Sequence, residues 1–126
     1  MIGYVDTQVV VWLCEDKVAK FSTRALDALN ELDLLVSPMV MIELAYLYEI
    51  ERIIRAPQDL IKQLRMQLGV RVCDHSFPDL AETALFENWT RDPFDRLIVA
   101  HAKSNNYAPL ITSDSTIRRH YPKTVW

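Results

Sequence analysis

Short apolar segments alternate with longer amphipathic segments along the whole chain, and this alternation constrains the fold more than any other feature. It predicts four strands and one further edge strand: Ile2–Val5, Leu34–Ser37, Val70–Cys73, Leu110–Thr112 and Val125–Trp126. It predicts helices between them: Gln8–Cys14, Ser22–Leu32, Met39–Arg55, Pro57–Leu68, Pro78–Glu87, one from Pro93 onward and a short one after Asp114. We therefore expect an α/β fold, a three-layer α/β/α sandwich around a mainly parallel sheet of four to five strands.

The composition fits a single domain over residues 1–126. Half of the residues are hydrophobic, which is enough for a real core, and only two are glycine, which argues against a glycine-rich phosphate loop. No apolar run is long enough to span a bilayer, and the opening residues lack the basic region of a signal peptide. We expect a cytoplasmic protein with no membrane partner, in which Cys14 and Cys73 are free thiols.

The charge balance limits how the chain could bind nucleic acid. Its net charge of −3 gives no global attraction to a polyanion, so binding would need a local basic patch or metal ions. Arg118, Arg119 and His120 form the one dense basic cluster. These side chains are either ordinary solvated surface or weak candidates for substrate contact. Trp12, Trp89 and Trp126 are predicted to pack, with base stacking by Trp12 as the alternative.

The segment Arg91–Ala102 places two carboxylates at the start of a buried helix. Pro93 fits the first helical turn, and Asp92 just before it can cap the free backbone amides. Asp95 lies three residues further on, at the same end of the helix, and the cap formed by Asp92 does not account for it. An acid at this position is either a second cap or a ligand.

Three more acids stand near the predicted carboxyl ends of strands. Asp6 ends the first strand, Asp114 follows the fourth, and Glu43 comes six residues after the second. In a parallel sheet these ends share one edge, where α/β folds bind their ligands. Together with Asp95 they would form a quartet at that edge.

Each acid of the quartet also has a simpler explanation. Asp6 and Asp114 could cap the helices that follow them, and Glu43 could form a surface salt bridge. Asp95 could pair with Arg91 or Arg96.

Four converging carboxylates would repel one another and raise one another's pKa unless a cation compensates. Mg²⁺ and Mn²⁺ prefer oxygen ligands and suit phosphodiester hydrolysis. A zinc site is not indicated, because the three histidines share no ligand spacing with the cysteines, and His101 is predicted to be a hydrogen-bonded core residue.

Four motifs in this order resemble the PIN-domain ribonucleases, and in particular the VapC toxins of prokaryotic toxin–antitoxin pairs: YVDTQVVVWL, SPMVMIELAYL, RDPFDRLIVAHA and LITSD. The resemblance covers essentially the whole chain, although residues 52–75 carry no family signature. It implies that Asp6, Glu43, Asp95 and Asp114 are the catalytic acids that bind Mg²⁺ or Mn²⁺. Asp95, not Asp92, matches the family's acid.

The resemblance also implies roles for neighbouring residues and partners. Residues that orient the carboxylates or touch substrate would be the following: Thr7, Asp92, Arg96, Thr112 and Ser113. The implied activity is a metal-dependent endoribonuclease, the toxin of a type II toxin–antitoxin system. Its expected partners are an RNA substrate, a cognate VapB-like antitoxin and a second copy in a homodimer. The alternatives are a catalytically silent protein-binding module and a metal-dependent phosphatase or DNA nuclease.

Overall fold

The computed structural model describes all residues 1–126 and has one five-stranded parallel sheet. The strands, in the order β3-β2-β1-β4-β5, have these bounds: β1 Ile2–Val5, β2 Asp33–Val36, β3 Arg71–Val72, β4 Leu110–Ile111 and β5 Thr124–Val125. Every neighbouring pair is parallel. The predicted α/β/α architecture is therefore confirmed, including the short edge strand at the C-terminal end.

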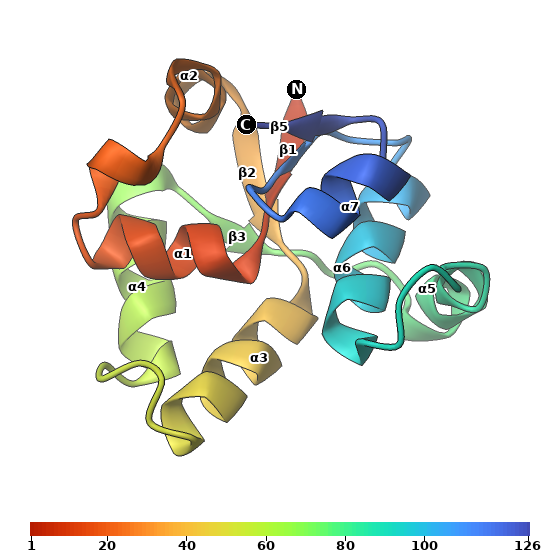
Figure 1. Cartoon of the computed structure of the whole chain (residues 1–126), viewed down its shortest axis with the longest axis horizontal. Helices are drawn as coiled ribbons and strands as arrows, with labels where there is room; N and C mark the ends of the chain where they lie inside the picture. Colours follow the sequence, from red (N-terminus) through yellow and green to blue (C-terminus); the bar gives the residue numbers. More distant parts are fainter.

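Helices cover both faces of the sheet (Figure 1). Their bounds are as follows: α1 Thr7–Cys14, α2 Thr23–Glu31, α3 Pro38–Glu49, α4 Pro57–Leu68, α5 Phe77–Ala84, α6 Pro93–Ser104 and α7 Ser115–His120, with the 3₁₀ turn η1 at Val18–Lys20. In Figure 1, α1, α2 and α4 lie on one side of the sheet and α5, α6 and α7 on the other. No helix is both long and apolar enough to cross a membrane.

Local signals set most helix ends where the sequence places them. The Ser22 hydroxyl accepts a hydrogen bond from the Ala25 amide at the start of α2. Proline occupies the first turn of α3, α4, α5 and α6, where a missing N–H costs nothing. Gly69 ends α4 in the left-handed conformation, with φ of 67°.

Helix α3 differs from its prediction. It ends at Glu49 instead of Arg55, and Glu51 adopts a φ of 61° as the chain turns toward α4. Only Val40 and Leu44 on it are fully buried. Three apolar residues of the predicted Met39–Arg55 helix are exposed: Ile42 by 56%, Tyr48 by 44% and Ile50 by 43%. The helix packs on α1, α4 and α6, and Met39 and Leu47 are partly buried against the core.

The core contains polar groups that burial has neutralised. His101 is 1% exposed, as predicted for a core histidine. Burial lowers the pKa of His101 to about 4 and keeps the ring uncharged at neutral pH. Tyr4, which stacks on His101, shares its hydroxyl between Cys73 Sγ at 3.1 Å and Asn105 Nδ2 at 3.0 Å.

The strand order creates a switch point beside β1. The chain leaves β1 to form β2 on one side and returns to form β4 on the other. Asp6 follows β1, and Asp114 comes three residues after β4. The crevice at such a point is where open α/β sheets bind ligands.

Candidate active site

Asp6 and Asp114 are linked through one hydroxyl at the switch point. Asp6 is 6% exposed, and its Oδ1 accepts a hydrogen bond from the Thr7 amide at 2.8 Å. Its Oδ2 accepts one from Thr112 Oγ1 at 2.6 Å. The same Thr112 oxygen accepts the Asp114 amide at 3.1 Å. Thr112, which is fully buried, therefore fixes both acids relative to the end of β4.

We expect Thr112→Val to destabilise the fold by about 1–3 kcal/mol, because it leaves the buried Asp6 carboxylate and the Asp114 amide each short of a partner. Urea unfolding measures the change. Thr124→Val on β5 is the matched control, since the Thr124 side chain is only half-buried. Equal stability losses in the two variants would contradict this role of Thr112.

Asp92 and Asp114 act as helix caps, as the sequence indicates. Asp92 Oδ1 accepts the amides of Phe94 at 2.8 Å and Asp95 at 3.3 Å. Asp114 Oδ1 accepts the amides of Thr116 and Ile117, both at 2.9 Å. Each cap uses a single carboxylate oxygen. Capping therefore leaves the second oxygen of Asp114 for another ligand.

No acid of the quartet has a basic partner. The ion pairs of the structure join the Met1 amine to Asp33, Lys17 to Glu15 and Lys103 to Glu87. The salt bridges considered for Glu43 and Asp95 are thus absent. Arg96 instead donates its Nε–H to the Thr90 carbonyl at 2.9 Å. The negative charge at this edge of the sheet is not compensated by the protein.

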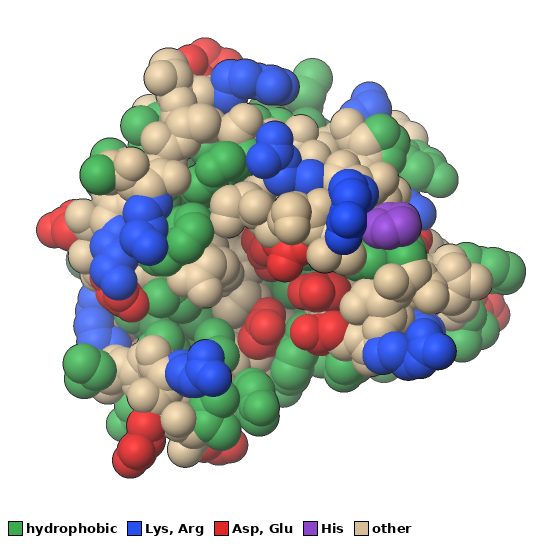
Figure 2. Space-filling view, in the orientation of Figure 1, with side chains coloured by type: hydrophobic (Ala, Val, Ile, Leu, Met, Phe, Trp, Pro, Cys, Tyr) green, Lys and Arg blue, Asp and Glu red, His purple; other side chains and the backbone are tan.

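The acids perturb one another electrostatically. Burial raises the pKa of Asp95 to about 8, and the charges of Asp92, Asp6, Asp114 and Glu43 add to the increase. Burial likewise raises the pKa of Glu43 to about 7, with Asp6 contributing and the Thr7 hydroxyl opposing the shift. The pKa of Asp6 is raised too, first by burial. Figure 2 shows acidic side chains gathered at the centre of one face, with basic side chains and a histidine beside them.

The donor set fits a hard divalent cation. Every charged candidate ligand is a carboxylate oxygen, and the buried Thr7 hydroxyl lies beside Glu43. As the side chains stand, no group of three or more His, Cys, Asp or Glu converges closely enough to hold an ion by itself. Mg²⁺ does not need such a cage, because it keeps several waters and takes one or two carboxylates directly. The uncompensated charge and the oxygen-only chemistry both match it.

Residues 3–122 match the family described as the PIN domain. The chain belongs to the PIN domain family. This confirms the family to which the sequence motifs pointed. No curated protein sequence matches the chain significantly.

The fold of this PIN domain is similar to solved toxin–antitoxin structures. It matches VapBC2 from Rickettsia felis bound to a promoter DNA fragment, with a TM-score of 0.66, 17% identity and full coverage of both chains. It matches VapBC-1 from nontypeable Haemophilus influenzae with a TM-score of 0.62 and 19% identity, over 100% of this chain and 96% of that one. DNA-bound VapBC from Salmonella typhimurium gives 0.61 and 15%, over 98% and 95%. At these identities the likeness shows the fold.

The remaining candidate residues lie around the acidic edge with differing exposure. Thr7 is buried, and Ser113 is half-buried. Arg118 and Arg119 are exposed on α7, where Arg119 Nη2 donates to Thr116 Oγ1 at 3.3 Å. Neither arginine pairs with an acid, so both are free to meet an anion.

Sequence reasoning missed a buried carboxylate in the connection between α5 and α6. Glu87 is 2% exposed and forms an ion pair with Lys103. It also accepts a hydrogen bond from Trp89 Nε1 at 2.5 Å. Nothing in the local sequence distinguishes Glu87 from a surface acid, because its ionic partner lies sixteen residues away.

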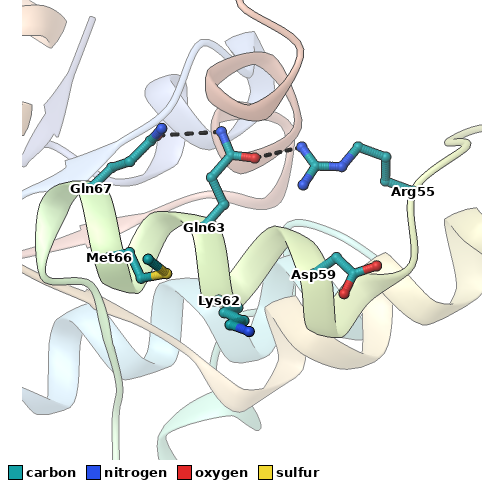
Figure 3. A pocket seen from close by; sticks show the side chains of 6 residues that line it. All are labelled: Arg55, Asp59, Lys62, Gln63, Met66 and Gln67. Carbon is teal, nitrogen blue, oxygen red and sulfur yellow. Dashed lines mark hydrogen bonds between the residues drawn. The ribbon is translucent and has the colours of Figure 1, made fainter.

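A shallow pocket elsewhere on the PIN domain is a poor alternative site. It has a volume of about 350 Å³ on the exposed side of α4 and is lined by Arg55, Asp59, Lys62, Gln63, Met66 and Gln67 (Figure 3). Gln63 joins Arg55 and Gln67 through hydrogen bonds of 2.5 and 3.3 Å. Its one acid has no second carboxylate beside it, so the pocket lacks the chemistry of the switch point.

Proposed function

We propose that this PIN domain is a metal-dependent endoribonuclease and acts as the toxin of a type II toxin–antitoxin pair. The observation that carries the proposal is the quartet of carboxylates at the switch point, which no basic side chain compensates. Four acids gathered at a ligand-binding edge cost stability and are retained where they hold a cation. The fold shared with VapBC complexes supports the toxin assignment.

Asp6, Glu43, Asp95 and Asp114 would hold the Mg²⁺ or Mn²⁺. When bound, such an ion activates water and neutralises the charge that develops on a phosphate. The hydrogen bond from Thr112 orients Asp6, and Asp92 fixes the first turn of α6 that carries Asp95. Glu43, with a pKa of about 7, is matched to accept a proton near neutral pH.

The expected partners fit the charges and the exposed apolar residues of the surface. A VapB-like antitoxin that places a basic side chain against the acidic edge would block the site and lower its electrostatic cost. The exposed apolar residues of α3, among them Ile42 and Tyr46, suit a homodimer interface. With cellular RNA as the substrate, we expect a cytoplasmic location.

Two alternatives are weaker. A catalytically silent binding module has no use for acids that repel one another without a cation. A DNA nuclease would use the same metal chemistry, so the substrate must decide between the two.

Cleavage of a mixed RNA pool tests the proposal, with single-stranded DNA of matched sequence in parallel and Mg²⁺ or Mn²⁺ in both. We expect RNA fragments that depend on the metal and disappear with EDTA, and intact DNA. Cleavage that survives EDTA would contradict the metal dependence. Cleavage of DNA alone would replace the RNA substrate with DNA.

A further inference from the structure

An aromatic stack stands beside the acidic edge without using any of its acids. The rings of Trp89 and His120 have centroids 5.0 Å apart and planes inclined by only 11°. Trp89 lies three residues before the α6 cap Asp92, and His120 ends α7, the helix capped by Asp114. Six helical residues span about 9 Å. His120 therefore lies about 9 Å along α7 from Asp114, within the length of one or two nucleotides.

The orientation of the Trp89 side chain is fixed by contacts with buried residues of the protein. Its Nε1 donates to Glu87 Oε2, and the buried Glu87 carboxylate is neutralised by Lys103. A buried carboxylate without these partners would be very costly, so the three side chains are ordered together. The preceding contacts fix the orientation of the indole before any ligand arrives.

His120 is exposed, although Trp89 covers one face of its ring. The last turn of α7 also carries Arg118 and Arg119, both exposed and free of acidic partners. An exposed aromatic ring and positive charge thus lie together in the last turn of α7.

Trp12, the base-stacking alternative from the sequence, is engaged within the protein. Its ring packs against Phe21 and Trp126 at centroid distances of 6.3 and 5.8 Å, and Lys20 Nζ lies 4.9 Å from it. Trp12 therefore has little ring surface to offer, whereas His120 does.

We propose that His120, stacked on Trp89, is the binding platform for an unpaired nucleobase of the RNA strand that is cut at the acidic edge. The inference rests on the proposed ribonuclease function and adds a base-binding residue beside its site. Unpaired bases that are splayed out of a strand stack against imidazole and indole rings, and arginines beside such rings contact the flanking phosphates. A base held in a duplex cannot reach the ring, so the platform selects single-stranded RNA.

Steady-state cleavage of one single-stranded RNA oligonucleotide by His120→Ala and His120→Phe tests the platform. Loss of one stacked base should raise KM about ten-fold in His120→Ala with kcat nearly unchanged. His120→Phe keeps an aromatic ring and should retain the wild-type KM. Because His120 is exposed, both variants should keep the wild-type melting temperature.

Tyr107→Ala is the matched control. Tyr107 is an exposed ring that stacks on Tyr121 at 6.5 Å and 18°. It follows the C-terminal end of α6, and the twelve residues of that helix span about 18 Å from the acidic edge. Removing this ring should leave KM unchanged.

Three results would overturn the platform: an unchanged KM in His120→Ala, an equal rise in His120→Phe, or an equal loss on duplex RNA. Binding of a fluorescein-labelled single strand without metal, followed by anisotropy, separates this inference from the proposed function. If the wild type cuts no RNA, the proposed function fails. The platform is judged separately by the anisotropy assay, and it fails if His120→Ala binds the labelled strand as tightly as the wild type does.

Discussion

Asp95→Asn is expected to reduce RNA cleavage by at least about 100-fold while the chain stays folded. Asparagine keeps the shape of the side chain and removes the charge that would face the cation. Asp95 is half-buried at the first turn of α6 and has no basic partner in the protein, so its charge is not needed for folding. Initial rates with Mn²⁺ and a circular dichroism spectrum measure the two effects.

Asp92→Asn is the matched control for Asp95→Asn. It lies three residues away at the same helix end and makes the same change from carboxylate to amide. Asparagine caps a helix about as well as aspartate, so the hydrogen bonds to the Phe94 and Asp95 amides should survive. We expect a loss of activity of no more than about ten-fold. Equal losses of activity in the two variants would contradict the assignment of Asp95, and not Asp92, as a metal ligand.

Without divalent ions, the folded state is expected to lose stability as the pH rises from about 4 to about 8. The pKa of Asp95 is raised from 3.8 to about 8, and that of Glu43 from 4.5 to about 7. A carboxyl with a higher pKa in the folded state binds its proton more tightly there than in the unfolded chain. Its contribution is therefore favourable at low pH and disappears as the proton is lost. Thermal melts across this range measure the trend.

Mg²⁺ or Mn²⁺ should restore the stability lost at pH 8 and change little at pH 5, because protonated carboxyls bind the ion poorly. An ion at one hundred times its Kd stabilises the fold by about 2.7 kcal/mol. Asp95→Asn should melt at a higher temperature than the wild type at pH 8 without metal, and should gain less from the ion. A melting temperature that is the same at pH 5 and pH 8, or one unaffected by metal, would count against a coupled acidic site.

The sequence predicted those parts of the site that depend on local structure. Asp6 was placed at the end of a strand and Asp92 at a helix cap, since both features are encoded by residues next to them. The two explanations left open for Asp114, cap or ligand, prove compatible: capping engages only one of its oxygens. Parallel strands with shared carboxyl ends then account for the meeting of Asp6 and Asp114 through Thr112.

Features that depend on contacts between distant segments could not be predicted from the sequence. The Glu87–Lys103 pair joins the α5–α6 connection to the end of α6, and the Trp89–His120 stack joins that connection to α7. Helix α3 ends at Glu49 and the chain turns at Glu51 with a φ of 61°, which apolar periodicity does not reveal.

Titration of the purified chain with Mn²⁺ at pH 8, followed by calorimetry or by the loss of the free-ion electron spin resonance signal, tests the metal site most directly. The uncompensated quartet predicts saturable binding by the wild type that Asp95→Asn weakens by at least about ten-fold and Asp92→Asn largely preserves. No saturable binding by the wild type, or equal binding by all three proteins, would contradict a metal centre at the switch point.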